Sequence, residues 1–523
     1  MITLKHNPRQ QQDQMLNFFK ESINSKKKFL LLDVSVGCGK SYFAVMAMKW
    51  YVENIDKNAK FDILTNTKIL QNQYTADFDF IRSIKGKNNY NCEKWNLTCD
   101  DGQDLNKLNK TECSFCPSKA AYEEFLNAKV GLANFHVYLS YLIYVPTFIE
   151  KRCSNVLFVD EAHSFEEVFC EFISSTISRS SMNRWGIKNA RLLSKLDRIG
   201  SIETYIKFVT DDLIPVLNIR YKELKEQCKL AAVQNVKLKI LKDYSFLDKV
   251  ICKFNRFINE SEDNTEKWVF YKEKDKDGLT VLKTELVWGK DHLEMIWKNY
   301  DHVIFMSGTI LNKNFFKNYM GLKQDVAYMS LDSPFEVKNR LVYNLDIGKL
   351  SYREKHDTYK DLPQVINTIL NKHKNEKGII HTNSYEISNI IMHSIDNDRL
   401  IFHDIDDRED KLQEHYESTN ASVIVSPSMT NGIDLKDDLS RFQIIVKVPF
   451  PNLASPKVKK RLKTMPDWYQ WKSVAEILQS YGRSIRSEND YAKTYILDSC
   501  FDNMLKMNKN LFPKYFLDAI IDA

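Results

Sequence analysis

A nine-residue polar segment after an apolar run has the residue types needed to bind a phosphate group. Phe29–Leu32 is followed by residues 33–41, Asp-Val-Ser-Val-Gly-Cys-Gly-Lys-Ser, and then by a helical stretch. Glycines let backbone N–H groups turn toward phosphate oxygens, and the N-terminus of a helix adds positive potential. Lys40 would reach the β- and γ-phosphates, and Ser41 would bind magnesium. The segment therefore predicts a nucleotide-binding loop formed by Gly37, Gly39, Lys40 and Ser41.

Two adjacent carboxylates end a second apolar run. Val156–Val159 is followed by Asp160-Glu161-Ala162-His163. In a parallel sheet the carboxyl ends of the strands form the edge where ligands bind. Asp160 would hold the magnesium shell, and Glu161 would orient and deprotonate the attacking water. A four-residue match alone is a weak signal, but together with an upstream phosphate loop it predicts an ATPase site.

A third group of polar residues lies far downstream, at Gln479, Arg483 and Arg486. Arginines three residues apart lie on one face of a helix, where both can meet one γ-phosphate. Guanidinium groups stabilise the charge that develops on a transferred phosphoryl group. An isolated pair would be read as a surface helix with ion pairs, but this pair lies in a different predicted domain from the phosphate loop. We therefore predict that ATP binds between two domains, with these three residues as catalytic groups.

Four cysteines have a spacing suited to a metal centre. Cys92, Cys99, Cys113 and Cys116 form the pattern C-x6-C-x13-C-x2-C. Four thiolates bind a tetrahedral zinc ion or a 4Fe–4S cluster. The N-terminal segment lacks the apolar core of a secretory signal, so a reducing compartment is expected for the ten cysteines. Spacing alone leaves both metals open and favours zinc, the commoner structural metal.

Apolar runs that alternate with helical stretches must position these groups. The runs are Phe29–Leu32, Phe61–Leu64, Val156–Val159 and Val303–Met306, and then Gly378–His381, Leu400–Phe402, Ser422–Val425, Ile444–Val448 and Thr494–Leu497. Continuous apolar strands separated by helices are typical of parallel sheets that are covered on both faces. Two series of strands predict two α/β domains. Between them, residues 165–290 carry Leu, Ile, Lys and Glu at helical spacing, which predicts a mostly helical insertion.

Composition and charge narrow the class of protein only slightly. The 75 basic and 69 acidic residues leave a net charge of +6, a weak indication of a polyanionic partner. The apolar stretch 130–149 contains several polar residues and Pro146, so it predicts a buried strand and a helix and not a membrane span. The basic run 457–463 is expected to be solvated surface. We expect an intracellular protein, cytoplasmic or nucleoid-associated, with no membrane association.

The order of these motifs resembles superfamily 2 helicases and, within them, the iron–sulfur XPD/DinG group. The resemblance spans nearly the whole chain. Residues 9–15 resemble the family segment that lies near the nucleotide base. The helicase motifs follow in the family's order: motif I at 33–41, Ia at 65–73, II (the tetrapeptide DEAH) at 160–163, III at 307–309, IV at 378–385, V at 431–435 and VI at 479–486. Departures from the family pattern are Val34, Gly308 and Asn431. The resemblance implies nucleotide contacts for Gln12, Gly432 and Asp434.

The segment leading to the first cysteine is the most specific match. Residues 84–92, Ile-Lys-Gly-Lys-Asn-Asn-Tyr-Asn-Cys, resemble the family's L-K-G-R-x-N-Y-x-C. This likeness implies a 4Fe–4S cluster at the four cysteines, with zinc as the alternative.

The resemblance implies an α/β protein of two RecA-like motor domains in which the first carries two insertions. Motor domain 1 would comprise residues 1–84, 134–164 and 291–333. An iron–sulfur cluster domain at 85–133 and a helical arch at 165–290 would interrupt it, and motor domain 2 would be 334–523.

The implied activity is that of an ATP- and Mg²⁺-dependent DNA helicase. It would move 5′ to 3′ on single-stranded DNA as a monomer and unwind duplex or forked DNA, with an RNA–DNA hybrid as a further candidate substrate. The alternative is a DNA-stimulated ATPase that translocates and remodels protein–nucleic acid complexes without separating strands.

Overall fold

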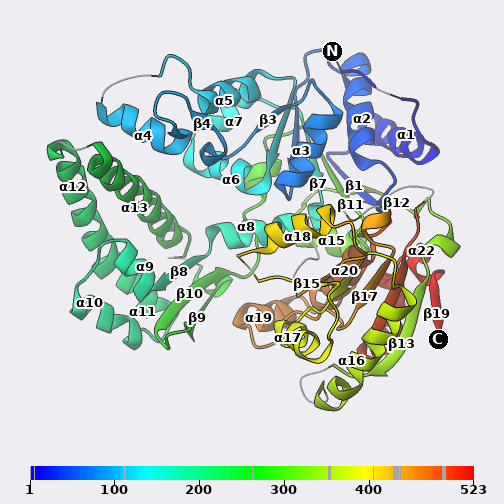
Figure 1. Ribbon diagram of the computed structural model, residues 1–523. Coiled ribbons are helices and arrows are strands. Elements are labelled where there is room, and N and C mark those ends of the chain that lie inside the picture. The colour runs from blue at the N-terminus through cyan, green and yellow to red at the C-terminus, as the bar shows by residue number, and fades with distance from the viewer. Residues whose placement is uncertain are drawn as a thin grey trace.

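Each of the two series of strands forms one seven-stranded parallel sheet (Figure 1). The structure is a computed structural model that describes residues 2–4, 6–109, 113–231, 234–261, 264–350, 355–404, 406–427, 435, 437–485 and 490–522. The predicted α/β class with two parallel sheets is confirmed.

The first sheet draws its strands from three separate stretches of the chain. Its order is β12-β1-β11-β7-β2-β6-β3. The strands are β1 (Phe29–Val34), β2 (Phe61–Thr65), β3 (Arg82–Ile84), β6 (Val130–Asn134), β7 (Val156–Asp160), β11 (His302–Ser307) and β12 (Val326–Leu331). Because β1, β11 and β7 are parallel neighbours, the loops that follow them meet at one edge of the sheet.

The apolar runs are continuous because each strand feeds two cores. In β1, Phe29 and Leu31 pack into the core on one face, whereas Leu30 and Leu32 pack into the core on the other. Successive side chains of a strand point to opposite faces, so a sheet covered on both sides needs an apolar residue at every position.

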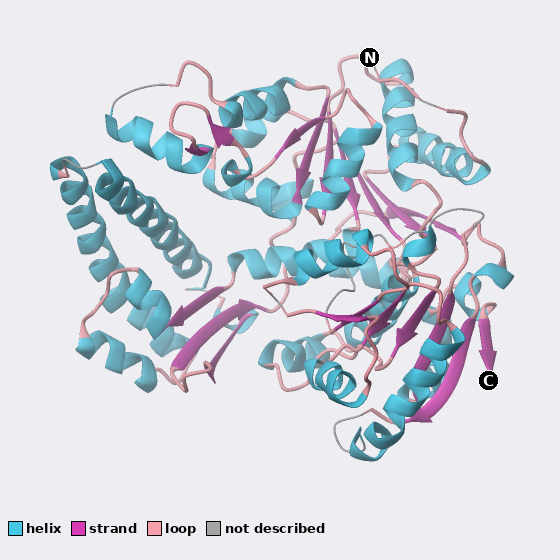
Figure 2. Cartoon of the chain, in the orientation of Figure 1, coloured by secondary structure: helices cyan, strands magenta, loops and turns pink. Residues whose placement is uncertain are grey.

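The second sheet has the order β15-β16-β14-β17-β18-β13-β19. Its strands are β13 (Val342–Gly348), β14 (Gly378–His381), β15 (Leu400–Phe402), β16 (Val423–Ser426), β17 (Phe442–Ile445), β18 (Lys493–Asp498) and β19 (Ile520–Asp522). Helices cover both sheets, as Figure 2 shows.

The helices around the first sheet are α1 (Gln10–Asn24), α2 (Lys40–Asn54), α3 (Lys68–Asp77), α6 (Phe135–Tyr144), α7 (Phe148–Arg152), α8 (Phe165–Ile173), α14 (Glu294–Trp297) and α15 (Lys313–Tyr319). Those of the second domain are α16 (Lys355–Lys372), α17 (Tyr385–Ser394), α18 (Arg408–Glu417), α19 (Pro456–Thr464), α20 (Asp467–Tyr481), α21 (Cys500–Met507) and α22 (Lys514–Leu517). Among the described residues, no helix combines the length and the apolar character needed to cross a membrane.

Two insertions project from the first domain on the same side (Figure 1). The cysteine-bearing one contains β4 (Asn91–Cys92), β5 (Leu97–Thr98), α4 (Cys99–Asn109) and α5 (Pro117–Asn127). The other contains α9 (Arg179–Arg184), α10 (Ala190–Lys195), α11 (Ile202–Lys207), α12 (Ile214–Leu230) and α13 (Gln234–Ser261).

The second insertion contains a small sheet as well as helices. It contains a three-stranded antiparallel sheet of β8 (Ser175–Ser178), β9 (Trp268–Lys274) and β10 (Thr280–Leu286), in the order β8-β10-β9. In β10 buried and half-buried positions alternate. Its apolar positions are therefore interrupted by polar ones, as in a sheet that buries one face only.

Candidate nucleotide site

The loop between β1 and α2 passes twice through the left-handed region of backbone conformation. Gly37 has φ 87° and Gly39 has φ 79°, a region that glycine enters without steric cost. Neighbouring side chains also crowd the loop. A Cβ on Gly37 would lie 2.1 Å from the Phe335 ring, and one on Gly39 would lie 2.1 Å from Nε2 of Gln12. Backbone conformation and space therefore both require glycine here.

Lys40 and Ser41 form the first turn of α2, directly after this loop. The Lys40 ammonium folds back over the loop and donates a hydrogen bond to the Val34 carbonyl at 3.4 Å. Gln12 is buried beside the loop and accepts a hydrogen bond from the Arg9 N–H at 2.8 Å. The structure thus brings Gln12, Gly37, Gly39, Lys40 and Ser41 together.

Asp160 is the last residue of β7 and lies at the sheet edge where the loops that follow β1, β11 and β7 meet. Its Oδ1 accepts the Glu161 N–H at 3.0 Å, and its Oδ2 accepts the Tyr74 hydroxyl at 3.1 Å. Burial, and then the charge of Glu161, raise the pKa of Asp160 to about 6, although Lys40 opposes the shift. A buried carboxylate with few donors around it favours a nearby cation.

Glu161 has a strained backbone, with φ 53°. Non-glycine residues in this region concentrate at functional sites, where the surrounding structure holds them in place. The Glu161 carboxylate lies 3.4 Å from Nδ1 of His163. Burial lowers the pKa of His163, so the imidazole is neutral near pH 7.

A chain of hydrogen bonds links His163 to the second domain. Its Nδ1 lies 2.9 Å from the Ser307 hydroxyl, which lies 3.1 Å from the Thr309 hydroxyl. Gln479 donates to the Thr309 hydroxyl at 3.1 Å, and Arg483 donates to Oε1 of Gln479 at 2.9 Å. The second predicted domain thus contacts the carboxylate motif of the first domain. The sequence predicts these residues as parts of separate motifs, and the structure brings them into one chain of contacts.

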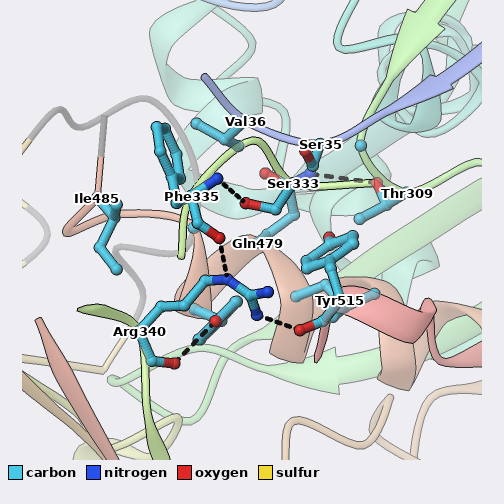
Figure 3. A pocket seen from close by; sticks show the side chains of 13 residues that line it. Ser35, Val36, Thr309, Ser333, Phe335, Arg340, Gln479, Ile485 and Tyr515 are labelled. Carbon is cyan, nitrogen blue, oxygen red and sulfur yellow. Dashed lines mark hydrogen bonds between the residues drawn. The ribbon is translucent and has the colours of Figure 1, made fainter. Parts of the chain in front are cut away.

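A cavity lies between the phosphate loop and the helix that carries Gln479. Ser35, Val36, Thr309, Phe335, Gln479 and Tyr515 are among its lining residues (Figure 3). Arg340 forms one wall, where its guanidinium donates to the Phe335 carbonyl at 3.0 Å and to the Tyr515 carbonyl. The cavity therefore lies between the domains, beside the loop predicted to bind phosphate.

Three predicted site residues fall outside the described part of the chain. They are Gly432, Asp434 and Arg486. Gln479 and Arg483, from the same predicted motif as Arg486, are described and buried.

Asp33 is a site residue that the sequence analysis did not single out. Its carboxylate accepts the N–H groups of Ile310 and Leu311 at 3.2 and 2.9 Å, and the Tyr328 hydroxyl at 3.0 Å. Burial raises the pKa of Asp33 to about 6 against these hydrogen bonds. Asp33 thereby ties the start of the phosphate loop to the segment after β11. The signal was a carboxylate inside an otherwise apolar strand.

Gly308, a departure from the family pattern, has a packing explanation. A Cβ at this position would lie 3.3 Å from the Val34 carbonyl oxygen, closer than ordinary van der Waals contact. Val34 and Gly308 are both departures, and they face each other across neighbouring strands.

The four predicted metal-ligand cysteines lie near one another as two pairs. The sulfurs of Cys92 and Cys113 are 4.0 Å apart, and the thiol of Cys99 hydrogen-bonds with that of Cys116. Within the described part of the chain, no group of three or more histidine, cysteine or acidic side chains is arranged to hold a metal ion. The structure therefore does not show an iron–sulfur or zinc site.

The basic run 457–463 is not simply solvated surface, contrary to expectation. Arg461 of α19 is 1% exposed and binds both carboxylate oxygens of Glu166, at 2.9 and 3.0 Å. It also donates to the Val287 carbonyl at 2.7 Å, and its guanidinium lies over the rings of Trp288 and Trp468. Lys460 donates to the Trp268 carbonyl at 3.0 Å.

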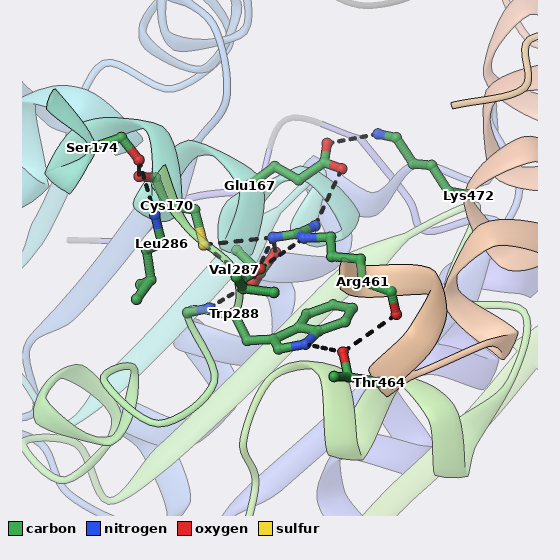
Figure 4. A network of polar contacts seen from close by, with 11 residues as sticks. Glu167, Cys170, Ser174, Leu286, Val287, Trp288, Arg461, Thr464 and Lys472 are labelled. Atoms are coloured by element: carbon green, nitrogen blue, oxygen red, sulfur yellow. Dashed lines mark hydrogen bonds and ion pairs between the residues drawn. The ribbon is translucent and has the colours of Figure 1, made fainter. Parts of the chain in front are cut away.

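These contacts join three parts of the molecule around the helix that follows the carboxylate motif. Glu166 and Glu167 are on α8, Arg461 is on α19 of the second domain, and Val287 follows β10 of the second insertion. Lys472 of α20 pairs with Glu167 at 2.6 Å (Figure 4). Burial raises the pKa of Glu167, but Lys472 and Arg461 outweigh burial and lower it to about 2.

Comparisons with known proteins find a match in each of the two predicted motor regions. A model of the helicase C-terminal domain matches residues 366–518, and a model of the res subunit of type III restriction enzymes matches residues 5–182. The ATP-dependent DNA helicase XPD of Sulfolobus acidocaldarius is 22% identical over 42% of this chain and 43% of its own length. The ATP-dependent DNA helicase CHL1 of Debaryomyces hansenii is 27% identical over 23% of this chain and 19% of its own length. The chain thus matches less than half the length of these relatives.

The fold agrees along the whole chain. One XPD helicase structure superposes with a TM-score of 0.68 at 16% identity and covers 100% of both chains. An XPD structure without ligand gives a TM-score of 0.65 at 17% identity, over 96% of this chain and 98% of the other. The chain is similar to the XPD helicases in part of its sequence and in its whole fold. The tetrapeptide at 160–163 suggests the label of DEAH-box helicase. That label is wrong for this XPD-like chain, in which the tetrapeptide is motif II.

Proposed function

We propose that this XPD-like protein is an ATP-dependent DNA helicase that moves 5′ to 3′ on single-stranded DNA and unwinds forked duplexes. The observation that carries the proposal is the chain of contacts that runs from Glu161 and His163 in one sheet domain to Gln479 and Arg483 in the other. A site shared by two domains can convert ATP binding and hydrolysis into relative movement of those domains.

The roles of the residues follow from where they lie. Lys40 at the start of α2 would bind the β- and γ-phosphates, and Glu161 would orient and deprotonate the water that attacks the γ-phosphate. Arg483 would stabilise the charge that develops on the transferred group. Magnesium bound by Ser41 and Asp160 would neutralise phosphate charge. Because Arg483 belongs to the second domain, hydrolysis would weaken the contact between the domains.

The two insertions support a strand-threading arrangement. Lys242 of α13 pairs with Asp101 of α4 at 2.8 Å, and Lys249 lies 3.6 Å from Asp100. The cysteine-bearing insertion and the arch therefore meet at their helices. Together with the first domain, they can frame a path for one DNA strand. We propose residues 85–133 and 165–290 as the bounds of these insertions.

Strand displacement on forked DNA tests the proposal. Substrates with only a 5′ tail, only a 3′ tail, or both tails would be incubated with ATP and Mg²⁺, and an RNA–DNA hybrid would be included. We expect displacement that needs the 5′ tail. ATP hydrolysis stimulated by single-stranded DNA without displacement on any fork would instead establish the translocase alternative.

We further propose that the four cysteines hold a 4Fe–4S cluster, and their surroundings fit one. Asn106 Nδ2 lies 2.7 Å from the Cys113 sulfur and Gln103 Nε2 lies 3.5 Å from the Cys116 sulfur, so both can donate to thiolates. Gly102 leaves room for Cys92, because a Cβ there would lie 2.5 Å from its sulfur. In a 4Fe–4S cluster each cysteine ligates a different iron, so three thiolates need not converge on one ion. Zinc, which would draw the four thiolates around one ion, is the alternative.

Replacing Cys113 with serine should remove the cluster. We expect anaerobically purified protein to contain about four iron atoms per chain, and the variant to lose most of this iron together with the brown colour. Iron and zinc measured in the same preparation check this. Cys252→Ser is the matched control, because Cys252 is an exposed thiol in the arch and should leave the iron unchanged. Stoichiometric zinc without iron in the unmodified protein would contradict the assignment.

A further inference from the structure

Tyr74 is a buried tyrosine whose hydroxyl lies at the predicted magnesium site. It belongs to α3, its side chain is 1% exposed, and its hydroxyl donates to Oδ2 of Asp160 at 3.1 Å. Burial, and then the charge of Asp160, raise its pKa well above the ordinary value, while a hydrogen bond from the Ser41 hydroxyl opposes this. Tyr74 therefore contacts both side chains that would bind magnesium.

Packing alone does not explain the hydroxyl. The Tyr74 ring lies in the apolar core that includes Tyr42 and Phe78, where phenylalanine would fill the same space. A buried hydroxyl costs free energy unless it is hydrogen-bonded. Oδ2 of Asp160 accepts one hydrogen bond from Tyr74, and Oδ1 accepts one from the Glu161 N–H. Each oxygen therefore keeps a lone pair for a cation or for a water molecule bound to that cation.

The helix that carries Tyr74 is also tied to the cysteine-bearing insertion. One turn before Tyr74, Nε2 of Gln71 donates to the Ser83 hydroxyl and to the Ile84 carbonyl, both at 2.7 Å. Lys85 donates to Oδ1 of Asn72 at 2.8 Å. Ile84 and Lys85 are the residues where the chain leaves β3 for the cysteines. The helix that carries Tyr74 is therefore fixed at the point where that insertion begins.

We propose that Tyr74 is a positioning residue of the magnesium site, where its hydroxyl holds the Asp160 carboxylate in place beside Ser41. This inference rests on the proposed function, since it takes Mg²⁺ and nucleotide to bind between Ser41 and Asp160. Hydrogen bonds to a side chain that itself binds a metal orient that side chain, and their loss typically weakens metal binding 10- to 100-fold.

The test is Tyr74→Phe, which removes one oxygen and keeps the ring. Two quantities would be measured in the full-length protein: the Mg²⁺ concentration that half-saturates ATP hydrolysis, and the affinity for Mn²⁺ in the presence of ADP by electron paramagnetic resonance. We expect both to weaken by about tenfold, with ADP affinity in excess EDTA unchanged. A general loss of structure would weaken ADP binding in EDTA as well.

Tyr300→Phe is the matched control. The Tyr300 hydroxyl donates to Oδ2 of Asp62 at 2.8 Å, so it too is a buried tyrosine bound to a buried carboxylate of the same domain. We expect this variant to keep the wild-type Mg²⁺ and Mn²⁺ dependence. If Tyr74→Phe keeps it as well while the wild type hydrolyses ATP, the role of Tyr74 is disproved and the proposed function stands. If the wild type does not hydrolyse ATP but Tyr74→Phe still weakens Mn²⁺–ADP binding, the helicase proposal fails and the inference stands.

Discussion

Lys40→Ala is expected to lower ATP hydrolysis by about 100- to 1000-fold, the usual cost of removing one group that meets developing charge in a transition state. In the structure the Lys40 ammonium bonds the Val34 carbonyl, from which it can swing to a phosphate bound in the loop. Alanine leaves the loop glycines and α2 intact, so we expect binding of single-stranded DNA to be retained while unwinding is lost. Phosphate release and fluorescence anisotropy of labelled DNA measure the two properties.

Lys49→Ala is the control for this variant. Lys49 lies on the same helix, is 40% exposed and makes only a 4.0 Å ion pair with Glu53, so its removal should leave hydrolysis unchanged. Wild-type hydrolysis by Lys40→Ala would show that the nucleotide site has been placed wrongly. Simultaneous loss of DNA binding would show instead that the loop helps to hold the DNA.

Arg461→Ala is expected to cost about 3–5 kcal/mol of folding stability, because it leaves the Glu166 carboxylate buried without its cation. Glu166 is 0% exposed, and it also accepts the Gly289 N–H at 2.6 Å and the Cys170 thiol at 3.2 Å. Denaturant-induced unfolding of the variant and the wild type measures the difference. We also expect DNA to stimulate ATP hydrolysis less, since Arg461 joins the second domain and the arch to the helix after motif II.

The double variant Glu166→Gln, Arg461→Met separates stability from coupling. It removes the charge at both ends of the pair and keeps an amide oxygen to accept the Gly289 N–H. Replacing both partners of a buried pair is often close to neutral, so we expect most of the stability to return while stimulation by DNA stays weak. If Arg461→Ala unfolds at the same denaturant concentration as the wild type, Arg461 does not stabilise the folded protein. Full stimulation of the double variant would contradict the coupling.

Local features of the sequence determined the fold class and the individual motifs. Every predicted apolar run overlaps a strand, and Gly378–His381 and Leu400–Phe402 match β14 and β15 to the residue. A strand that is buried on both faces appears in the sequence as a continuous apolar run, and a phosphate loop appears as glycines at fixed offsets from a lysine. Both can therefore be recognised from the local sequence, without knowledge of what packs against them. Among the strands of the two large sheets that were not predicted, β3, β12 and β19 lie at sheet edges and β13 lies next to an edge strand. Such strands are short or partly exposed and leave a weaker pattern.

Only the tertiary structure decided which of these groups act together. Tyr74 and Asp160 are 86 residues apart in the chain, and Arg461 and Glu166 are 295 apart. Their partnership depends on how sheets and helices pack, and no local spacing encodes it. Arg461 shows this most clearly, because a basic run in the sequence gives no sign that one of its side chains is buried against a carboxylate of another domain. The sequence by itself thus indicated a phosphate loop, paired carboxylates and downstream arginines, and the packing determined that the carboxylates lie close to Gln479 and Arg483 where the two domains meet.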